Sequence, residues 1–197
     1  FQVSVAKWEA LDIEHWIFII GYFLKLMIPQ NTKSSPEAIR RNFDQQVDRF
    51  SNIETGQTTA IDSPLCMELV SRSALLLNPD AKNVMDLGCG GGNYAVKIAS
   101  LLPDVDCTLV DISANMLERA VERVREIISG KVTALHGDYR ELDLGENQYD
   151  VITAGTTLHH LRDDEEWKLV FSKVYKALKP GGTFWINDIV IGETDEI

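Results

Sequence analysis

The stretch that decides the fold is Val84-Met85-Asp86-Leu87-Gly88-Cys89-Gly90-Gly91-Gly92-Asn93-Tyr94. It starts with an apolar run that is short enough for a buried strand, and a helical pattern follows from Tyr94. Glycines between a strand and a helix let the chain turn sharply and let its backbone lie against a ligand. The stretch therefore predicts a ligand-binding loop at the carboxyl end of a strand.

The generic dinucleotide-binding motif G-x-G-x-x-G does not fit this loop. Counted from Gly88, its third glycine falls at Asn93, which makes a NAD oxidoreductase the weaker interpretation. The loop shows instead an acid followed by alternating glycines, Asp86, Gly88, Gly90 and Gly92. The same glycines are also compatible with a tight turn that binds nothing.

Strands alternate with helices over the rest of the chain. Apolar runs typical of strands occupy residues 83–87, 107–112, 132–136, 149–154 and 183–190. Segments of helical periodicity lie between them, two of which begin after the capping residues Ser113 and Asp163. This order predicts an α/β fold, with a doubly wound, mainly parallel sheet and helices on both faces. Ligands in such sheets bind at the carboxyl ends of the strands.

Five motifs in register resemble the class I S-adenosylmethionine-dependent methyltransferases, whose fold is Rossmann-like. The acid-and-glycine loop is the first motif. The second motif, Asp111-Ile112, ends the second strand, and the third, Gly137-Asp138-Tyr139, follows the third strand. The fourth motif is the fourth strand itself, Asp150-Val151-Ile152-Thr153-Ala154, and the fifth is the turn into the fifth strand, Leu178-Lys179-Pro180-Gly181-Gly182-Thr183. The resemblance covers roughly residues 65–190 and implies transfer of a methyl group to a small molecule.

The resemblance also implies roles for single residues toward S-adenosylmethionine. Asp111 would accept hydrogen bonds from the ribose, Ile112 would pack on the adenine, and Asp138 would accept from the adenine amino group beside the backbone amide of Tyr139. The predicted cofactor-binding residues are Asp86, Gly88, Cys89, Gly90, Gly92, Asp111, Ile112, Asp138, Tyr139 and Ala154. A structural interpretation stays open for both acids: Asp111 as a helix cap, and Asp138 as part of a polar turn.

A catalytic base is expected only for some acceptors. The sulfonium already activates the methyl group, so the protein chiefly aligns a nucleophile and excludes water. If the acceptor is a hydroxyl or an acidic carbon, a base is useful, and His159-His160 follows the fourth strand at the correct edge of the sheet. We therefore predict His159 or His160 as the base, with a structural hydrogen bond as the alternative.

Three regions divide the chain. Residues 1–33 are expected to be an apolar, helical amino-terminal segment, residues 34–78 a helical cover over the active site, and residues 79–197 the S-adenosylmethionine-binding α/β domain. Phe43, Phe50 and Tyr94 are predicted to wall the acceptor pocket, and Arg49 to meet the carboxylate of the cofactor. Ordinary core packing is the alternative for the phenylalanines, which lie on one helical stripe.

The most apolar part of the amino-terminal segment is residues 16–28, interrupted by Lys25. The run is short of the ~20 apolar residues that cross a membrane, and no small-residue cleavage site follows it. We expect a helix that the rest of the chain or a partner covers, without stable membrane insertion. A homodimer through this segment is one such arrangement.

Composition narrows the classes of partner. The 197 residues include 30 acidic and 19 basic ones, for a formal net charge of −11. Such a surface repels phosphate backbones, so we expect no nucleic-acid partner. The three cysteines, Cys66, Cys89 and Cys107, have no metal-ligand spacing, so no metal site is predicted. Their odd number does not suggest a disulfide framework either, so a cytoplasmic location is expected.

Two further hypotheses stand beside methyl transfer. One is a relative that converts S-adenosylmethionine differently, as a carboxy-S-adenosylmethionine synthase does when it attaches a carboxyl-containing group to the sulfonium carbon. The other is a protein that binds the cofactor without turnover. The sheet of the family has seven strands and this sequence supplies five, so we also expect that a carboxyl-terminal part carrying the last two strands is missing.

Overall fold

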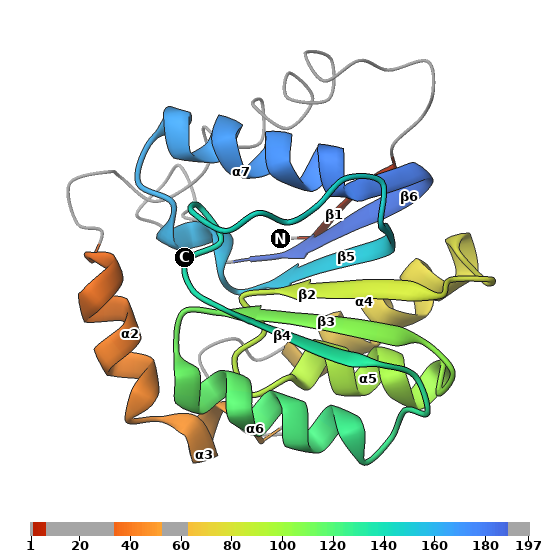
Figure 1. The fold of residues 1–197 in the computed structure, drawn as a ribbon, viewed down its shortest axis with the longest axis horizontal. Coiled ribbons are helices and arrows are strands. Elements are labelled where there is room, and N and C mark those ends of the chain that lie inside the picture. The colour runs from red at the N-terminus through yellow and green to blue at the C-terminus, as the bar shows by residue number, and fades with distance from the viewer. Residues whose placement is uncertain (1, 7–33, 53–62, 189–197) are drawn as a thin grey trace, which may run out of the picture.

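A computed structural model describes residues 2–6, 34–52 and 63–188, the first of these ranges by its backbone. They form a six-stranded sheet with helices on both faces (Figure 1). The strand order in the sheet is β1-β6-β5-β2-β3-β4. Consecutive elements therefore wind outward from β2 in both directions, which is the doubly wound arrangement that the sequence predicts.

Five strands run parallel to one another, as predicted. They are β2 (Asn83–Leu87), β3 (Asp106–Asp111), β4 (Val132–His136), β5 (Tyr149–Gly155) and β6 (Leu178–Asn187). The largest difference in bounds is at β6, which was expected at residues 183–190. Leu178 already pairs with Tyr149, residues 179–182 interrupt the register, and pairing resumes where Thr183 meets Val151.

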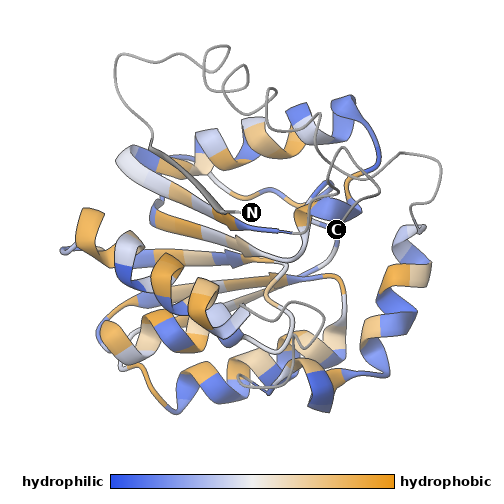
Figure 2. Cartoon of the chain, turned by 180° about the vertical axis from the view of Figure 1, so that it is seen from behind, coloured by the Kyte–Doolittle hydropathy of each residue, from blue (hydrophilic) through white to orange (hydrophobic). Residues whose placement is uncertain are grey.

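Helices cover the two faces of the sheet with separate apolar clusters. The helices α4 (Ser63–Leu77), α5 (Asn93–Leu101) and α6 (Ala114–Arg125) lie on one face, and α7 (Asp164–Ala177) lies on the other (Figure 1). Neighbouring residues of β2 point to opposite faces, because Val84 belongs to the first cluster and Met85 to the second. Figure 2 shows the consequence: central strands are largely hydrophobic, whereas the helices carry hydrophilic and hydrophobic residues side by side.

Both predicted helix caps form. The backbone N–H of Met116 donates to Ser113 Oγ over 3.2 Å, and that of Glu166 donates to Asp163 Oδ1 over 2.9 Å. These side chains satisfy amides that have no partner inside the first helical turn. They fix the points at which α6 and α7 leave the carboxyl edge of the sheet.

The predicted cover divides into two parts with different places in the fold. Its first part is the pair α2 (Pro36–Asp44) and α3 (Val47–Phe50), which break at Gln46 rather than continue as one helix. Asp44 anchors this pair to α6, because it accepts from Ser113 Oγ over 2.6 Å. The second part, α4, packs under the sheet against α5 and β6. The expectation of a cover over residues 34–78 is therefore wrong for α4, whose buried side chains belong to the core.

The beginning of the chain is a strand, not part of a helix. β1 (Gln2–Ala6) pairs antiparallel with β6, with Gln2 opposite Asn187 and Ala6 opposite Thr183. This sixth strand was not predicted, and it corrects the expectation of a wholly helical segment over residues 1–33. The apolar run at residues 16–28 lies outside the described residues. Among the described helices, none has the length and apolar character needed to cross a membrane.

Candidate active site

A cavity of about 230 Å³ opens at the carboxyl edge of the parallel sheet, between the strand ends and the cover helices α2 and α3. Four segments that follow strands contribute to its walls, as expected for this fold. The predicted residues that line it are Phe43, Arg49, Phe50, Asp86, Gly88, Cys89, Gly90, Tyr94, Asp111, Ile112, Asp138, Tyr139, His159 and His160. The first three sequence motifs and the two histidines thus converge on one site.

Gly88 makes the close approach that the loop needs. Its φ is +67°, and a Cβ there would lie 2.1 Å from Thr157 Oγ1, so a side chain is excluded by both conformation and space. Gly90 has a φ of +51°, and a Cβ there would meet no atom within 4 Å. Because Gly90 lines the cavity, its missing side chain leaves bare backbone facing open space.

Asp86 lies beneath this loop as a buried acid. Its carboxylate accepts from Thr153 Oγ1 over 2.9 Å and from the backbone N–H of Ala95 over 3.2 Å. Burial raises the pKa of Asp86 to about 7, because two hydrogen bonds only partly offset the loss of water around the charge. The acid ties the first turn of α5 to β5 under the floor of the cavity.

Asp111 joins the end of β3 to the glycine loop. Its Oδ2 accepts from the backbone N–H of Gly90 over 2.7 Å, and its Oδ1 accepts from that of Ser113 over 2.8 Å. Burial raises the pKa of Asp111, and the two amide bonds oppose that rise. Two donors on a carboxylate with four lone-pair sites leave acceptor capacity for a ligand.

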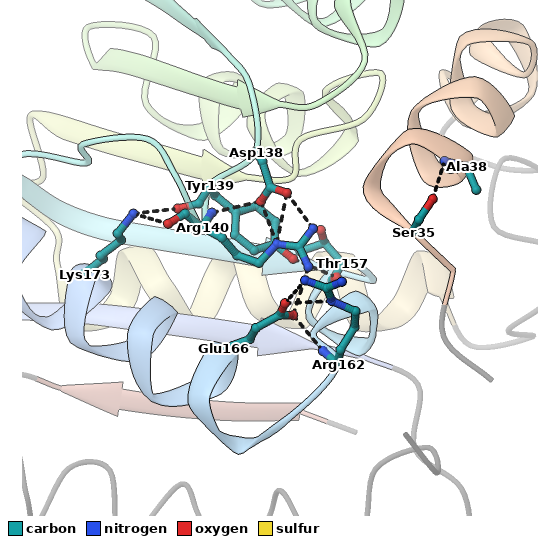
Figure 3. Close-up of polar contacts among 9 residues, drawn as sticks. All are labelled: Ser35, Ala38, Asp138, Tyr139, Arg140, Thr157, Arg162, Glu166 and Lys173. Atoms are coloured by element: carbon teal, nitrogen blue, oxygen red, sulfur yellow. Dashed lines mark hydrogen bonds and ion pairs between the residues drawn. The ribbon is translucent and has the colours of Figure 1, made fainter. Parts of the chain in front are cut away.

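Asp138 follows β4 and is held by a neighbouring cation. Arg140 Nε lies 2.8 Å from Asp138 Oδ1, Arg140 Nη2 lies 2.5 Å from Oδ2, and Arg140 Nη1 reaches Glu166 Oε2 on α7 at 2.9 Å (Figure 3). Next to them, the hydroxyl of Tyr139 donates to the backbone oxygen of Thr157 over 3.1 Å. Burial raises the pKa of Tyr139, so this hydroxyl stays protonated.

His159 is paired with a buried acid that the sequence interpretation missed. Its Nδ1 lies 2.7 Å from Asp188 Oδ1, and the side chain of Asp188 is fully buried. The other oxygen, Asp188 Oδ2, accepts from the backbone amides of Thr157, Leu158 and His159. The sequence interpretation placed Asp188 inside the fifth strand at residues 183–190, whereas β6 ends at Asn187, so that this acid follows the strand at the carboxyl edge.

The second histidine belongs to an aromatic wall. The ring of His160 lies 4.0 Å from that of His159 between centroids, and 5.9 Å from the ring of Phe43 on α2. Phe43 in turn contacts Phe50, with centroids 5.2 Å apart. The guanidinium of Arg49 lies over the Phe50 ring at 5.0 Å. The cover therefore presents mostly aromatic surface to the two histidines.

Asn93, which broke the dinucleotide motif, connects the glycine loop to the cover. Its Nδ2 donates to the backbone oxygen of Phe50 over 3.0 Å, and its Oδ1 accepts from Arg123 Nη1 over 2.8 Å. Arg123 also donates to the backbone oxygen of Gly91.

Two predicted cofactor residues, Gly92 and Ala154, are buried next to the cavity rather than among the residues that line it.

Residues 84–182 match the model of a protein family described as a methyltransferase domain. The chain belongs to this family. The predicted resemblance to class I S-adenosylmethionine-dependent methyltransferases is thereby confirmed at the level of the family and the fold. The matched residues run from β2 into the first part of β6, so they contain the glycine loop and the segments after β2, β3, β4 and β5 that line the cavity, whereas Asp188 lies beyond them.

Curated relatives of the methyltransferase domain carry related names. Demethylmenaquinone methyltransferase of Listeria welshimeri is 34% identical over 101 residues, which are 51% of this chain and 42% of that protein. The 27-O-demethylrifamycin SV methyltransferase of Amycolatopsis mediterranei is 28% identical over 170 residues, which are 81% of this chain and 61% of that protein. The chain thus spans about half the length of the curated relatives that it matches.

Solved structures share the fold of the methyltransferase domain. The cyclase SpnF has a TM-score of 0.63 at 20% identity and aligns with 82% of this chain and 62% of its own. The YcgJ protein of Bacillus subtilis has a TM-score of 0.50 at 26% identity and aligns with 63% of this chain and 50% of its own. SpnF is named as a cyclase and is only 20% identical to this chain, so the likeness to it shows a common fold alone.

The cavity fits S-adenosylmethionine, the cofactor of this family. Gly90 provides a cradle that a Cβ would fill, Asp111 keeps acceptor capacity after its two amide bonds, and the apolar Ile112 lies next to it. Backbone amides, an acceptor for hydroxyls and an apolar neighbour are the groups that a nucleoside requires.

Proposed function

We propose that this methyltransferase domain transfers the methyl group of S-adenosylmethionine to a hydroxyl oxygen of a small, largely apolar acceptor. The observation that carries the choice of a hydroxyl is the pair of His159 and Asp188 at the cavity. S-adenosylmethionine, when bound, supplies a methyl group that its positive sulfur already activates. The residues of the chain bind and orient the reactants, exclude water and accept a proton.

On the cofactor side, the proposal assigns the roles that the family resemblance implies. Asp111 would hold the ribose with Ile112 against the adenine, and Asp138 with Tyr139 would meet the far edge of the adenine. The backbone of the glycine loop would lie against the ligand, and the end of β5 at Ala154-Gly155-Thr156 would lie beside the methionine part. Arg49 suits the carboxylate of the cofactor, because it lines the cavity and forms no ion pair with the residues that the structure describes.

On the acceptor side, His159 has the arrangement of a general base. Since a carboxylate only accepts, the Nδ1–H of His159 donates to Asp188, and the lone pair of the neutral ring is then on Nε2. Nε2 would take the proton of the acceptor hydroxyl as its oxygen attacks the methyl group. The resulting imidazolium is stabilised by Asp188, which three backbone amides hold in place.

The walls favour an acceptor with a flat, apolar body. Phe43, Phe50 and His160 present ring edges and faces next to the proposed base, which excludes water and suits aromatic or unsaturated rings. The relative whose name describes 27-O-demethylrifamycin SV supports an oxygen as the methyl-accepting atom. The alternative of a carboxy-S-adenosylmethionine synthase is less well supported. Arg140, a cation at the cavity that could bind the added carboxyl group, is already paired with Asp138 and Glu166.

Direct binding tests the first half of the proposal. Calorimetric titration with S-adenosylmethionine and S-adenosylhomocysteine should show binding of both, whereas NAD should show none. If neither sulfur nucleoside binds the folded protein, methyl transfer is ruled out for this chain.

Variants of the proposed base test the second half. His159→Gln should lower kcat by about 10² to 10⁴, since it removes general-base catalysis. The rates are measured with an acceptor found among phenols, naphthols and hydroquinones, and the loss should increase with the pKa of the acceptor hydroxyl. His160→Gln is the control, because it changes the neighbouring ring and keeps the His159–Asp188 pair. Equal, small effects of both variants would contradict a base at His159.

We extend the proposal to partners and location. The net charge of −11 supports a small-molecule acceptor over nucleic acid, and the odd number of cysteines, which does not suggest a disulfide framework, supports a cytoplasmic location. The homodimer through residues 1–33 also stays a proposal. It predicts that in light scattering the unaltered chain has the mass of a dimer and a chain starting at residue 34 has the mass of a monomer, and a dimer mass for both chains would contradict it.

A further inference from the structure

Arg140 lies in a chain of charges that runs from the cavity to α7. The side chains of Arg140, Asp138 and Glu166 are 10%, 12% and 13% exposed, so they are nearly buried together. Arg140 donates to both acids, and Arg162 reaches Glu166 from the outer side of the network (Figure 3). Burial by itself would lower the pKa of Arg140, because it disfavours the charged form. The hydrogen bonds and charges of Asp138 and Glu166 have the larger effect and raise this pKa.

The network fixes Asp138 in one orientation. Three N–H groups of Arg140 reach it: the backbone N–H donates to Oδ1 over 2.9 Å, Nη2 donates to Oδ2, and the single N–H of Nε is shared between Oδ1 at 2.8 Å and Oδ2 at 3.0 Å. A carboxylate offers about four lone-pair sites, so one acceptor site remains, and it belongs to Oδ2. A planar guanidinium holds a carboxylate at two points, which a single point charge does not do.

The backbone around Asp138 is held just as firmly. Lys173 on α7 donates to the backbone oxygen of Arg140 (Figure 3) and also to that of Leu142 over 2.9 Å. Glu166 accepts from the backbone amide and the side chain of Arg162, and these bonds help to hold its pKa at about 2 although burial would raise it. Glu166 is therefore a fixed anion that pulls Arg140 toward α7.

We propose that Arg140 is a specificity-determining positioning residue, which makes the adenine subsite select a 6-aminopurine by leaving Asp138 a single oriented acceptor site. Glu166 holds Arg140 in this role. The inference rests on the proposed function, because it takes Asp138 as the residue that meets the adenine edge. An adenine amino group donates to that site, whereas the 6-oxo group of hypoxanthine places an acceptor against an acceptor.

The test compares two ligands that differ only at this position, S-adenosylhomocysteine and S-inosylhomocysteine, by calorimetric titration. The unaltered protein should bind the adenosine compound at least about tenfold more tightly, as expected for one hydrogen bond to a charged group. Arg140→Met should reduce this preference to about threefold or less. Arg140→Lys keeps the charge without the fork, so its preference should also fall.

Arg162→Met is the matched control. It removes another arginine from the same Glu166 but leaves the bonds between Arg140 and Asp138 in place, and its side chain is 47% exposed. Its preference should stay at the unaltered value. Glu166→Gln keeps the shape of the side chain and weakens its hold on Arg140, so it should give an intermediate preference. Thermal unfolding identifies which variants are folded.

The outcomes separate this inference from the proposed function. A full preference for the adenosine compound in the folded Arg140 variants, or in Glu166→Gln if those variants do not fold, would overturn the inference. Equal binding of both ligands by the unaltered protein would overturn it too, while methyl transfer would stand. Binding of neither ligand would remove the proposed function together with the inference.

Discussion

The fold changes the pKa of single buried acids in the site. Asp86 shows this best, because it is buried under the glycine loop with two donors and has a pKa raised to about 7. An aspartate in an unfolded chain has a pKa near 3.9. The folded state therefore binds the proton of Asp86 more tightly than the unfolded state does.

This difference predicts how stability depends on pH. Between about pH 4 and 7 the folded state holds more protons, so the contribution of Asp86 to the free energy of unfolding falls as pH rises and levels off above 7. Asp86→Asn has no proton to lose. Urea unfolding at pH 5 and 8 should show that the stability of the unaltered protein, relative to Asp86→Asn, falls by about 2 to 3 kcal/mol. Parallel pH profiles would contradict the raised pKa.

The site was predictable where it depends on neighbours along the sequence. Acids and glycines directly after strands were correctly placed at one edge, since parallel strands end there together. Asp188 and Arg140 could not be assigned a role, because their partners His159 and Glu166 are 29 and 26 residues away in the sequence. Only the packing of α7 and β6 brings these pairs together.

At the scale of elements, predictability followed the strength of the local signals. The five parallel strands and the helices α5, α6 and α7 were found, because apolar runs and capping residues mark them. The strand at Gln2–Ala6 was missed, since five residues without turn signals do not distinguish a strand from a helix. The break at Gln46 was missed because the apolar stripe continues across it.

The cover helices are predicted to depend on Asn93. Asn93→Asp keeps an acceptor for Arg123 but places a carboxylate against the backbone oxygen of Phe50, where the amide had donated. Losing a buried donor costs about 1 to 3 kcal/mol. Hydrogen exchange of amides 36–50 should therefore become about 5- to 150-fold faster, while that of α5 stays the same.

The control for this prediction acts on the other side of Asn93. Arg123→Met removes the donor to Asn93 Oδ1 and to Gly91 but keeps the bond from Asn93 to Phe50. Its cover amides should exchange at the unaltered rate. If Asn93→Asp also leaves the exchange of the cover unchanged, Asp44 and ring packing alone hold the cover.

At the scale of the whole molecule, β1 forms one edge of the sheet that the described residues build. It covers the edge of β6 that would otherwise expose unpaired backbone groups. A chain that starts at residue 34 lacks β1, so we expect a melting temperature lower by several degrees. Calorimetry measures this effect. An unchanged melting temperature would show that β1 contributes little to the stability of the sheet.

The pairing of β1 with β6 also constrains the order in which the molecule assembles. β1 is synthesised before the other described elements, yet its partner is the last described strand, so their contact must wait until the rest of the described sheet has been synthesised. Contacts between such distant parts of a chain form slowly, because a large loop has to close. The glycine loop and β2–β5 can therefore be in place before β1 pairs with β6.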